Sequence, residues 1–238
     1  MYAAWRGAAE HPDAFAERLV ASVGPSLVEA GALAVQVNVV DHHVAAGDGP
    51  PPRGHRRVTL DPAIDAVVSA WVRSAVTHLR TPLDRVLGDA GVGAVGYLVS
   101  ESVPLAPETP PAAGERTAGY TQVALLRRPA AMDEASWRVR WQDHHTEVAI
   151  RTQSTTAYRQ NLVVRPLHDA APPLAAIVEE TFPLAALTDP YAFFDAVGDD
   201  ARFAAHIEAM VASTSTFLDA DGGIDVLPTS EYVVRPLG

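Results

Sequence analysis

Hydrophobic positions along the chain follow two different periods. Apolar and polar residues alternate over short stretches such as Ala32–Val40, which is typical of a half-buried strand. Phe15, Leu19 and Val23 instead recur every four positions, which is typical of one face of a helix. Residues 1–105 therefore predict the order strand, helix, strand, strand, helix, strand, with strands at Met1–Trp5, Ala32–Val40, Ala63–Val72 and Val92–Val99.

The second half of the chain predicts the same order of elements. Asp133 and Asp189-Pro190 are typical helix starts, as is Thr81-Pro82 in the first half, because Asp and Thr cap helices and Pro suits the first helical position. The strands are expected at Tyr120–Leu126, Asn161–Leu167, Ala175–Phe182 and Ile224–Leu237. The last strands of the two halves also end in related strings, SESVPL and SEYVVRPL.

The repeated order predicts an α+β fold built from tandem ferredoxin-like βαββαβ units. We expect one degenerate unit at residues 1–105, a Pro- and Gly-rich linker at 106–119, and a second unit at 120–238. Each unit leaves one sheet face without helices, and an apolar face needs a partner. The two sheets are therefore expected to close on each other as an intrachain barrel of the dimeric α/β type.

The composition excludes several classes of function. A net charge of −11 argues against a nucleic-acid partner, which requires concentrated basic residues. The absence of cysteine excludes disulfides, thiolate nucleophiles and Cys-ligated metals. No apolar run reaches the ~20 residues that span a bilayer, and the N-terminus lacks a signal-peptide pattern. We therefore expect a cytoplasmic protein that is not bound to a membrane.

The side chains best suited to chemistry gather between Trp137 and Leu167. Trp137, Trp141 and His145 follow one another at four-residue spacing, so they share a helix face. Tyr158 and Asn161 come next, at the entrance to an apolar strand, where a phenol and an amide could hold a carbonyl or enolate oxygen. The alternative for each of these side chains is a structural role in the core or at an element end.

Residues of the second half resemble the EthD family of dimeric α/β-barrel proteins. The matching motifs, in chain order, are Trp141-x-x-x-His145, Tyr158-x-Gln160-Asn161, Glu179-x-x-Phe182 and Phe217-Leu218-Asp219. The resemblance covers residues 120–238, whereas the first half lacks these motifs. After the His, the family usually has Gly or Ala and then Pro, but this chain has Thr146-Glu147.

The resemblance implies a cofactor-independent enzyme that acts by acid/base chemistry on a small apolar or aromatic carbonyl compound. Isomerisation, cyclisation, decarboxylation and oxidation all stay open. In this hypothesis His145 moves the proton, Tyr158 and Asn161 hold the oxyanion, and Glu179 orients His145. The aromatic residues Trp137, Trp141, Phe182 and Phe217 are expected to bind the substrate.

Two other functions remain open at this point. One is a non-catalytic binder or accessory protein for a small hydrophobic ligand. The other is haem binding through His145, which only the wider superfamily suggests. A homodimer is compatible with either function, because the barrel is closed within one chain and its outer surface stays available.

Two further motifs are read as coincidences. Asp41-His42-His43 and Asp143-His144-His145 look like a repeated metal box, but adjacent histidines on a strand point in opposite directions. No metal site is expected. Gly91-x-Gly93-x-x-Gly96 spells a dinucleotide fingerprint but lies inside a predicted strand, with no helix after it.

Overall fold

A computed structural model describes residues 1–44, 60, 62–219 and 223–238. Its strands are β1 (Tyr2–Trp5), β2 (Ala34–Val39), β3 (Ala66–Trp71), β4 (Gly93–Leu105), β5 (Tyr120–Leu126), β6 (Ala157–Pro166), β7 (Ala176–Phe182) and β8 (Ile224–Arg235). The helices of the first half are α1 (Pro12–Arg18), the π segment η1 (Leu19–Val23), α2 (Gly24–Glu29) and α3 (Thr77–Asp89). Those of the second half are α4 (Glu134–Arg138), the π segment η2 (Val139–His145), α5 (Thr146–Thr152), the 3₁₀ turn η3 (Leu184–Leu187), α6 (Pro190–Phe193) and α7 (Asp200–Thr214).

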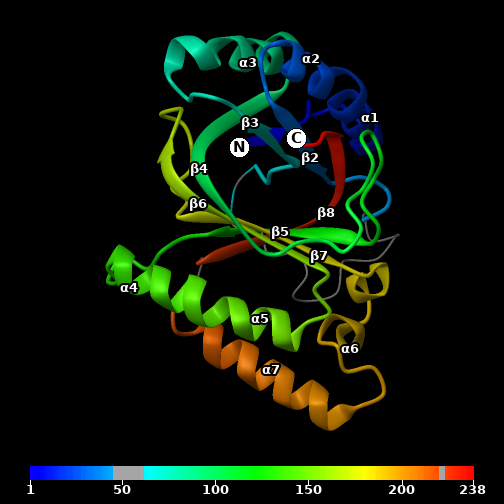
Figure 1. The fold of residues 1–238 in the computed structure, drawn as a ribbon, viewed down its shortest axis with the longest axis vertical. Helices are drawn as coiled ribbons and strands as arrows, with labels where there is room; N and C mark the ends of the chain where they lie inside the picture. Colours follow the sequence, from blue (N-terminus) through cyan, green and yellow to red (C-terminus); the bar gives the residue numbers. More distant parts are fainter. Residues whose placement is uncertain (45–59, 61, 220–222) are drawn as a thin grey trace.

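The strands form one closed antiparallel barrel in the order β1-β3-β2-β8-β5-β7-β6-β4 (Figure 1). The strands of the first half follow the order β4-β1-β3-β2, and those of the second half repeat it as β8-β5-β7-β6. The pairs β2–β8 and β4–β6 join the two sheets. The expected mixed helix-and-strand fold with a barrel closed within one chain is therefore confirmed.

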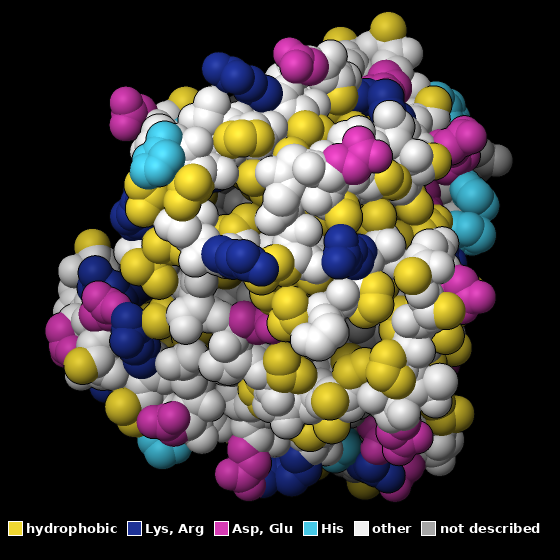
Figure 2. All heavy atoms as spheres, turned by 45° about the horizontal axis from the view of Figure 1, so that its top comes forward, with side chains coloured by type: hydrophobic (Ala, Val, Ile, Leu, Met, Phe, Trp, Pro, Cys, Tyr) yellow, Lys and Arg dark blue, Asp and Glu magenta, His cyan; other side chains and the backbone are white. Residues whose placement is uncertain are grey.

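Helices cover the barrel on two opposite sides. Helices α1, α2 and α3 lie over the first sheet, whereas α4, α5 and α7 lie over the second (Figure 1). None of the helices within the described ranges is long and apolar enough to cross a membrane. The surface mixes apolar, acidic and basic side chains, with no single charged patch on the face that Figure 2 shows.

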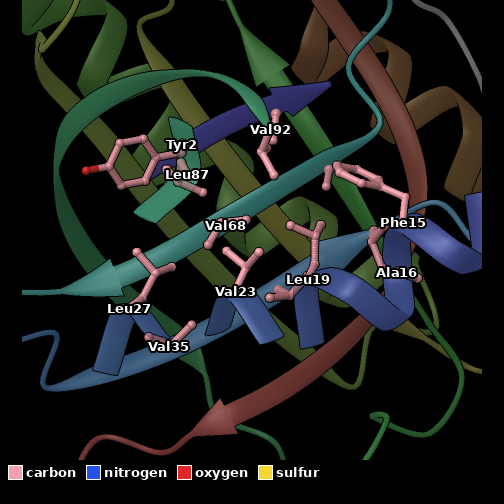
Figure 3. Close-up of a cluster of buried hydrophobic side chains, with 14 of the residues drawn as sticks. Tyr2, Phe15, Ala16, Leu19, Val23, Leu27, Val35, Val68, Leu87 and Val92 are labelled. Carbon is pink, nitrogen blue, oxygen red and sulfur yellow. The ribbon is translucent and has the colours of Figure 1, made fainter. Parts of the chain in front are cut away.

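Both long helical runs contain a π segment at their centre. The first run buries Phe15, Leu19, Val23 and Leu27 against the sheet (Figure 3). Residues four apart drift around a regular helix of 3.6 residues per turn, whereas a π turn takes more residues. The π segment η1 therefore keeps this four-residue series on one face.

Three local predictions need correction. Helix α3 begins at Thr77 rather than at Thr81, so Pro82 lies inside it. A proline there leaves the His78 carbonyl without its usual donor, and this end of the helix is exposed, so water can serve instead. Strand β6 begins at Ala157 rather than at Asn161, and β4 continues to Leu105 rather than ending at Val99.

The segment between the two halves is partly tied to the barrel. Gly114 N–H donates to the Val233 carbonyl at 2.7 Å, and Thr117 N–H donates to the Glu231 carbonyl at 2.8 Å. These bonds run along the part of β8 that pairs with β2 on its other side. The linker thus continues the second sheet by a short bridge.

Candidate active site

The second helical run places three of the candidate side chains on one face. Asp133 caps α4 by accepting a hydrogen bond from Ser136 N–H at 2.9 Å, as its sequence position predicts. The π segment η2 then keeps Trp137, Trp141 and His145 pointing at the sheet, as η1 does for its own series. Trp137 donates from Nε1 to the Phe217 carbonyl at 3.0 Å, which fixes the helix to the end of the α7 segment.

Strand alternation divides the candidate residues between two sites. Successive side chains of a strand point to opposite faces, so Glu179 and Glu180 of β7 diverge. Glu179 points into the barrel together with Asn161. Glu180 points outward, beneath the helices, where Tyr158 is its direct cross-strand neighbour. Tyr158 and Asn161 are three residues apart on β6, and they therefore face opposite sides as well.

The outer site is a cavity of 90 Å³ between the second sheet and its helices. Its lining includes Trp141, His145, Tyr158, Glu180 and Phe217. Four of the predicted catalytic and substrate-binding side chains thus meet at one place, together with the carboxyl of Glu180. The helix α7 segment closes the cavity from the outside through Met210 and Thr214.

Glu180 is a carboxyl group whose acidity this cavity alters strongly. Its side chain is buried, and burial raises the pKa of its carboxyl to about 7. Among the described residues, a long hydrogen bond from Gln122 Nε2, 3.5 Å from Oε2, opposes this rise in pKa. A carboxyl poised near neutrality and facing a cavity is suited to accept and return a proton.

Burial shifts the pKa of His145 in the opposite direction. Its pKa is lowered to about 4, because the apolar surroundings disfavour the charged imidazolium. Nδ1 lies 2.9 Å from the Ser213 Oγ, and the Phe217 ring packs against the imidazole with centroids 4.7 Å apart. The ring is therefore neutral at pH 7.

Tyr158 is held protonated and oriented. Burial and the nearby Glu180 raise the pKa of its phenol. Its hydroxyl lies beside the side chains of Gln160, Thr146 and Trp141. Gln160 in turn donates from Nε2 to Thr146 Oγ1 at 2.5 Å, which ties the strand to the start of α5.

The inner site is a polar cluster around Glu179 within the barrel. The Glu179 carboxylate accepts hydrogen bonds from Asn38, from Gln36 at 3.0 Å and from Asn161 at 3.1 Å. Arg159 adds an ion pair at 3.4 Å. With its oxygens so fully engaged, Glu179 has the environment of a structural carboxylate rather than of a proton carrier.

Two predicted arrangements are therefore wrong in their geometry. Glu179 does not orient His145, because the two side chains lie on opposite faces of the second sheet and His145 pairs with Ser213 instead. Asn161 does not share an oxyanion site with Tyr158, because these two residues of β6 point to opposite faces of the sheet. Phe182 also lies away from the cavity, stacked on Tyr120 at 5.5 Å under α6.

Glu180, Gln122 and Ser213 complete the outer site and were not predicted. Glu180 could have been found from the sequence, because it lies 22 residues after Tyr158 and an even separation across a hairpin-like pair is compatible with a shared face. Gln122 and Ser213 carried no such signal, since each stands alone within a strand or helix pattern. Only the packing of β5 and α7 brings Gln122 to the cavity and Ser213 to the His145 ring.

Neither a metal ion bound by the described residues nor a haem beside His145 is supported. Within residues 1–44, 60, 62–219 and 223–238, no three His, Asp or Glu side chains come close enough to hold a metal ion. The 90 Å³ cavity beside His145 is smaller than the ~150 Å³ that a benzene-sized guest occupies. Haem is several times larger than benzene, so it does not fit this site.

Comparisons with known proteins add no assignment. No family model matches the chain, and no curated protein matches it. The likeness to the EthD family therefore rests on the four motifs and on their order along residues 120–238.

Proposed function

We propose that the protein is an EthD-like, cofactor-independent enzyme that moves protons on a small carbonyl compound in the outer cavity. The observation that carries this proposal is the buried Glu180 carboxyl, which faces the same cavity as Tyr158 and His145 and has a pKa of about 7. Such a group is half ionised at neutral pH, where a general base is most effective. Structural carboxylates such as Glu179 are instead saturated with donors.

Three side chains have complementary roles in the proposed reaction. Glu180 removes a proton from a carbon next to the carbonyl, and the electron pair of that bond moves toward the carbonyl oxygen. Tyr158 donates a hydrogen bond to the oxygen as it gains charge. In a β,γ-unsaturated carbonyl compound, the electrons then move back from the oxygen and the protonated Glu180 returns the proton to the γ carbon. This step shifts the double bond without a cofactor.

His145 is assigned to substrate positioning. We assign the Ser213 hydroxyl as the donor to Nδ1, 2.9 Å away; the neutral ring then carries its hydrogen on Nε2 and presents a donor rather than a base. Phe217 and Trp141 form apolar walls beside it. This role differs from the proton transfer that the resemblance implies for His145.

The size of the cavity limits the substrate. A volume of 90 Å³ suits a compound of about four heavy atoms, since ~150 Å³ accommodates the six of benzene. An aromatic substrate requires α7 to shift, and no residue of α7 is fully buried. The repeated strand order also supports the interpretation of the fold as two ferredoxin-like units, of which the second keeps the site.

Proton exchange provides a test that does not require the natural substrate. Small ketones, enones and β-keto acids of about four to eight heavy atoms are incubated with the protein in D₂O, and proton NMR follows loss of the signals next to the carbonyl. We expect at least one compound to exchange, and Glu180→Gln to slow that exchange by ~10²-fold or more. Glu147→Gln, an exposed carboxylate on α5, is the matched control and leaves the rate unchanged.

Two results would contradict this proposal. The first is exchange that Glu180→Gln leaves unaffected. The second is a compound that binds, seen as broadened ligand signals, but never exchanges; this result would favour the alternative of a non-catalytic binder for a small hydrophobic ligand.

A further inference from the structure

The barrel wall has an opening beside the start of β1. Strand β1 pairs with β3 over Ala66–Val68 and with β4 over Gly93–Gly96, and Met1 before it exchanges two hydrogen bonds with Tyr97 and also lines the opening. Beyond these pairs, β3 continues to Trp71 and β4 continues past Tyr97, with no β1 residue between them. A pocket of 210 Å³ occupies this opening.

The pocket reaches from the outer surface to the polar cluster inside the barrel. Its lining includes Leu83 and Val72 on the outer side and Ser69, Trp71, Val99, Glu101 and Asn161 on the inner side. Asn161 also donates to Glu179, and Glu101 lies 3.5 Å from the Arg159 guanidinium. The pocket is thus continuous with the Glu179 cluster and separate from the cavity at Glu180, which lies on the other face of the second sheet.

Carboxylates outnumber cations in this cluster. Arg159 is shared among Glu101, Glu179 and Glu231, at distances of 3.4 to 3.5 Å. The α-amino group of Met1 also lies near Glu179, but burial lowers its pKa to about 5, so it adds little positive charge at pH 7. One guanidinium therefore faces three carboxyl groups. Burial raises the pKa of Glu101 and of Glu231, so an additional cation beside them would favour their ionised forms.

Ser69 gives an independent sign of a missing partner. Its side chain is 4% exposed and lines the pocket, yet its hydroxyl has no hydrogen-bond partner among the residues that the structure describes. It points inward from β3 next to Gln36, its cross-strand neighbour. A buried hydroxyl without a partner is costly unless a ligand or water satisfies it.

We propose that this opening binds a small organic cation, an ammonium group carried on an apolar body. The ammonium lies between the Glu101 carboxylate, the Asn161 side-chain oxygen and the Ser69 hydroxyl, all of which can accept its hydrogens. The apolar body lies against Val99 and the Trp71 indole, and an aromatic face also attracts a cation.

Arg80 at the outer side of the pocket does not make an anionic ligand more favourable than a cationic one. Arg80 lines the pocket, but its Nε donates to Asp84 at 2.9 Å. The Tyr2 hydroxyl donates to the same carboxylate at 2.9 Å. The positive charge of Arg80 is therefore balanced, while the carboxylates deeper in the pocket are not.

The test compares ligands of similar shape that differ in charge. The probes are 2-phenylethylamine, 2-phenylethanol and 3-phenylpropionate, which resemble one another in shape and suit 210 Å³, since benzene takes ~150 Å³. Isothermal titration calorimetry at pH 7 measures affinity, and quenching of Trp71 fluorescence, identified with Trp71→Phe, locates the site. We expect the amine to bind at least tenfold more tightly than the alcohol, and the carboxylate not to bind.

Two variants separate ligand recognition from folding. Ser69→Ala is expected to weaken amine binding several-fold while leaving the melting temperature unchanged or higher, because the hydroxyl it removes has no partner in the free protein. Glu101→Gln is expected to abolish the preference for the amine over the alcohol. Ser230→Ala is the matched control: Ser230 donates to Asp41 at 2.7 Å, so its loss lowers the melting temperature without changing amine affinity.

The proposal is overturned by equal affinities for the amine and the alcohol, or by amine binding that neither Ser69→Ala nor Glu101→Gln weakens. Glu180→Gln should leave amine binding intact, because Glu180 faces the other site. Failure of this proposal and failure of the proposed enzymatic function can therefore be told apart.

Discussion

Glu179 and Glu180 are adjacent in the chain, but their carboxyl groups lie in different electrostatic environments. Four donors stabilise the Glu179 carboxylate, whereas Glu180 is buried with one long hydrogen bond. The same side-chain chemistry thus serves a structural role at one position and is suited to proton transfer at the next. Their different surroundings predict different responses to the same substitution.

Replacing Glu179 by Gln should destabilise the protein. The amide cannot accept all the donors that converge on the carboxylate, and Arg159 loses a buried partner. We expect a loss of about 3 kcal/mol in the free energy of unfolding, measured by urea denaturation at pH 7. An unchanged free energy would contradict the assignment of Glu179 as the centre of the inner cluster.

Replacing Glu180 by Gln should have the opposite effect, and one that depends on pH. The folded protein raises the Glu180 pKa from 4.5 to about 7, so above pH 4.5 the unfolded chain releases a proton that the folded protein keeps. Stability is therefore lost as pH rises from about 4.5 to 7. Glu180→Gln should remove this loss and gain about 3 kcal/mol at pH 8 but nothing at pH 4.

His145 should oppose this pH dependence in the wild-type protein. Its pKa falls from 6.5 to about 4 on folding, so the unfolded chain binds a proton that the folded protein does not, and stability is lost as pH falls from about 6.5 to 4. The contributions of Glu180 and His145 to the pH dependence of stability nearly cancel between pH 4.5 and 6.5. Urea denaturation of Glu180→Gln should therefore show stability rising with pH over this window, where the wild type is flatter.

The helices show how an element can follow a four-residue pattern that a regular α-helix does not match. In both halves a π segment sits where the series of large apolar residues is centred, at Leu19–Val23 and at Val139–His145. The second π segment is what turns His145 toward the sheet along with Trp141. The four-residue spacing in the sequence indicated the shared face, but not the π turn that produces it.

Helix α3 offers a test of how an element tolerates an internal proline. Pro82 is exposed and follows Thr77, the first helical residue, by five positions. Pro82→Ala should restore a donor for the His78 carbonyl and raise the melting temperature, with a gain of about 1 kcal/mol. Pro82→Gly, which restores the donor but not the helix propensity, should give a smaller gain; no gain in either variant would contradict the explanation.

The molecule as a whole depends on contacts between its two halves. The β2–β8 and β4–β6 pairs close the barrel, and the apolar interior takes side chains from both halves, including Val67, Tyr97, Leu125 and Ile177. Neither half completes this interior without the other. The chain connection between the halves is less important than the strand pairs.

Cutting the connection should therefore leave the halves together. A protease site inserted after Glu108, before the segment that bonds to β8, lies in an exposed stretch. After cleavage, we expect gel filtration to show one species of unchanged size at pH 7, while denaturing electrophoresis shows two fragments. Separation of the fragments without denaturant would contradict a barrel closed by both strand pairs.

The order of elements and the buried helix faces follow from the sequence alone, because burial imposes a local period on each element. The four-residue spacing identifies the buried helix face in both halves, through Phe15, Leu19 and Val23 in the first and Trp137, Trp141 and His145 in the second. Most strands were also placed within a few residues, since alternation marks them. The start of β6 was missed, because Ala157–Gln160 lacks the apolar run that follows.

Only the tertiary structure decides which side chains meet. Strand parity separates Glu179 from Glu180, but the packing of helices on one face and of the other sheet on the opposite face determines which of the two has a partner-poor environment. The opening beside β1 likewise exists only because β3 and β4 extend beyond their pairs with β1. Both sites depend on residues from several elements. The local periods of the sequence do not determine the distances between those elements.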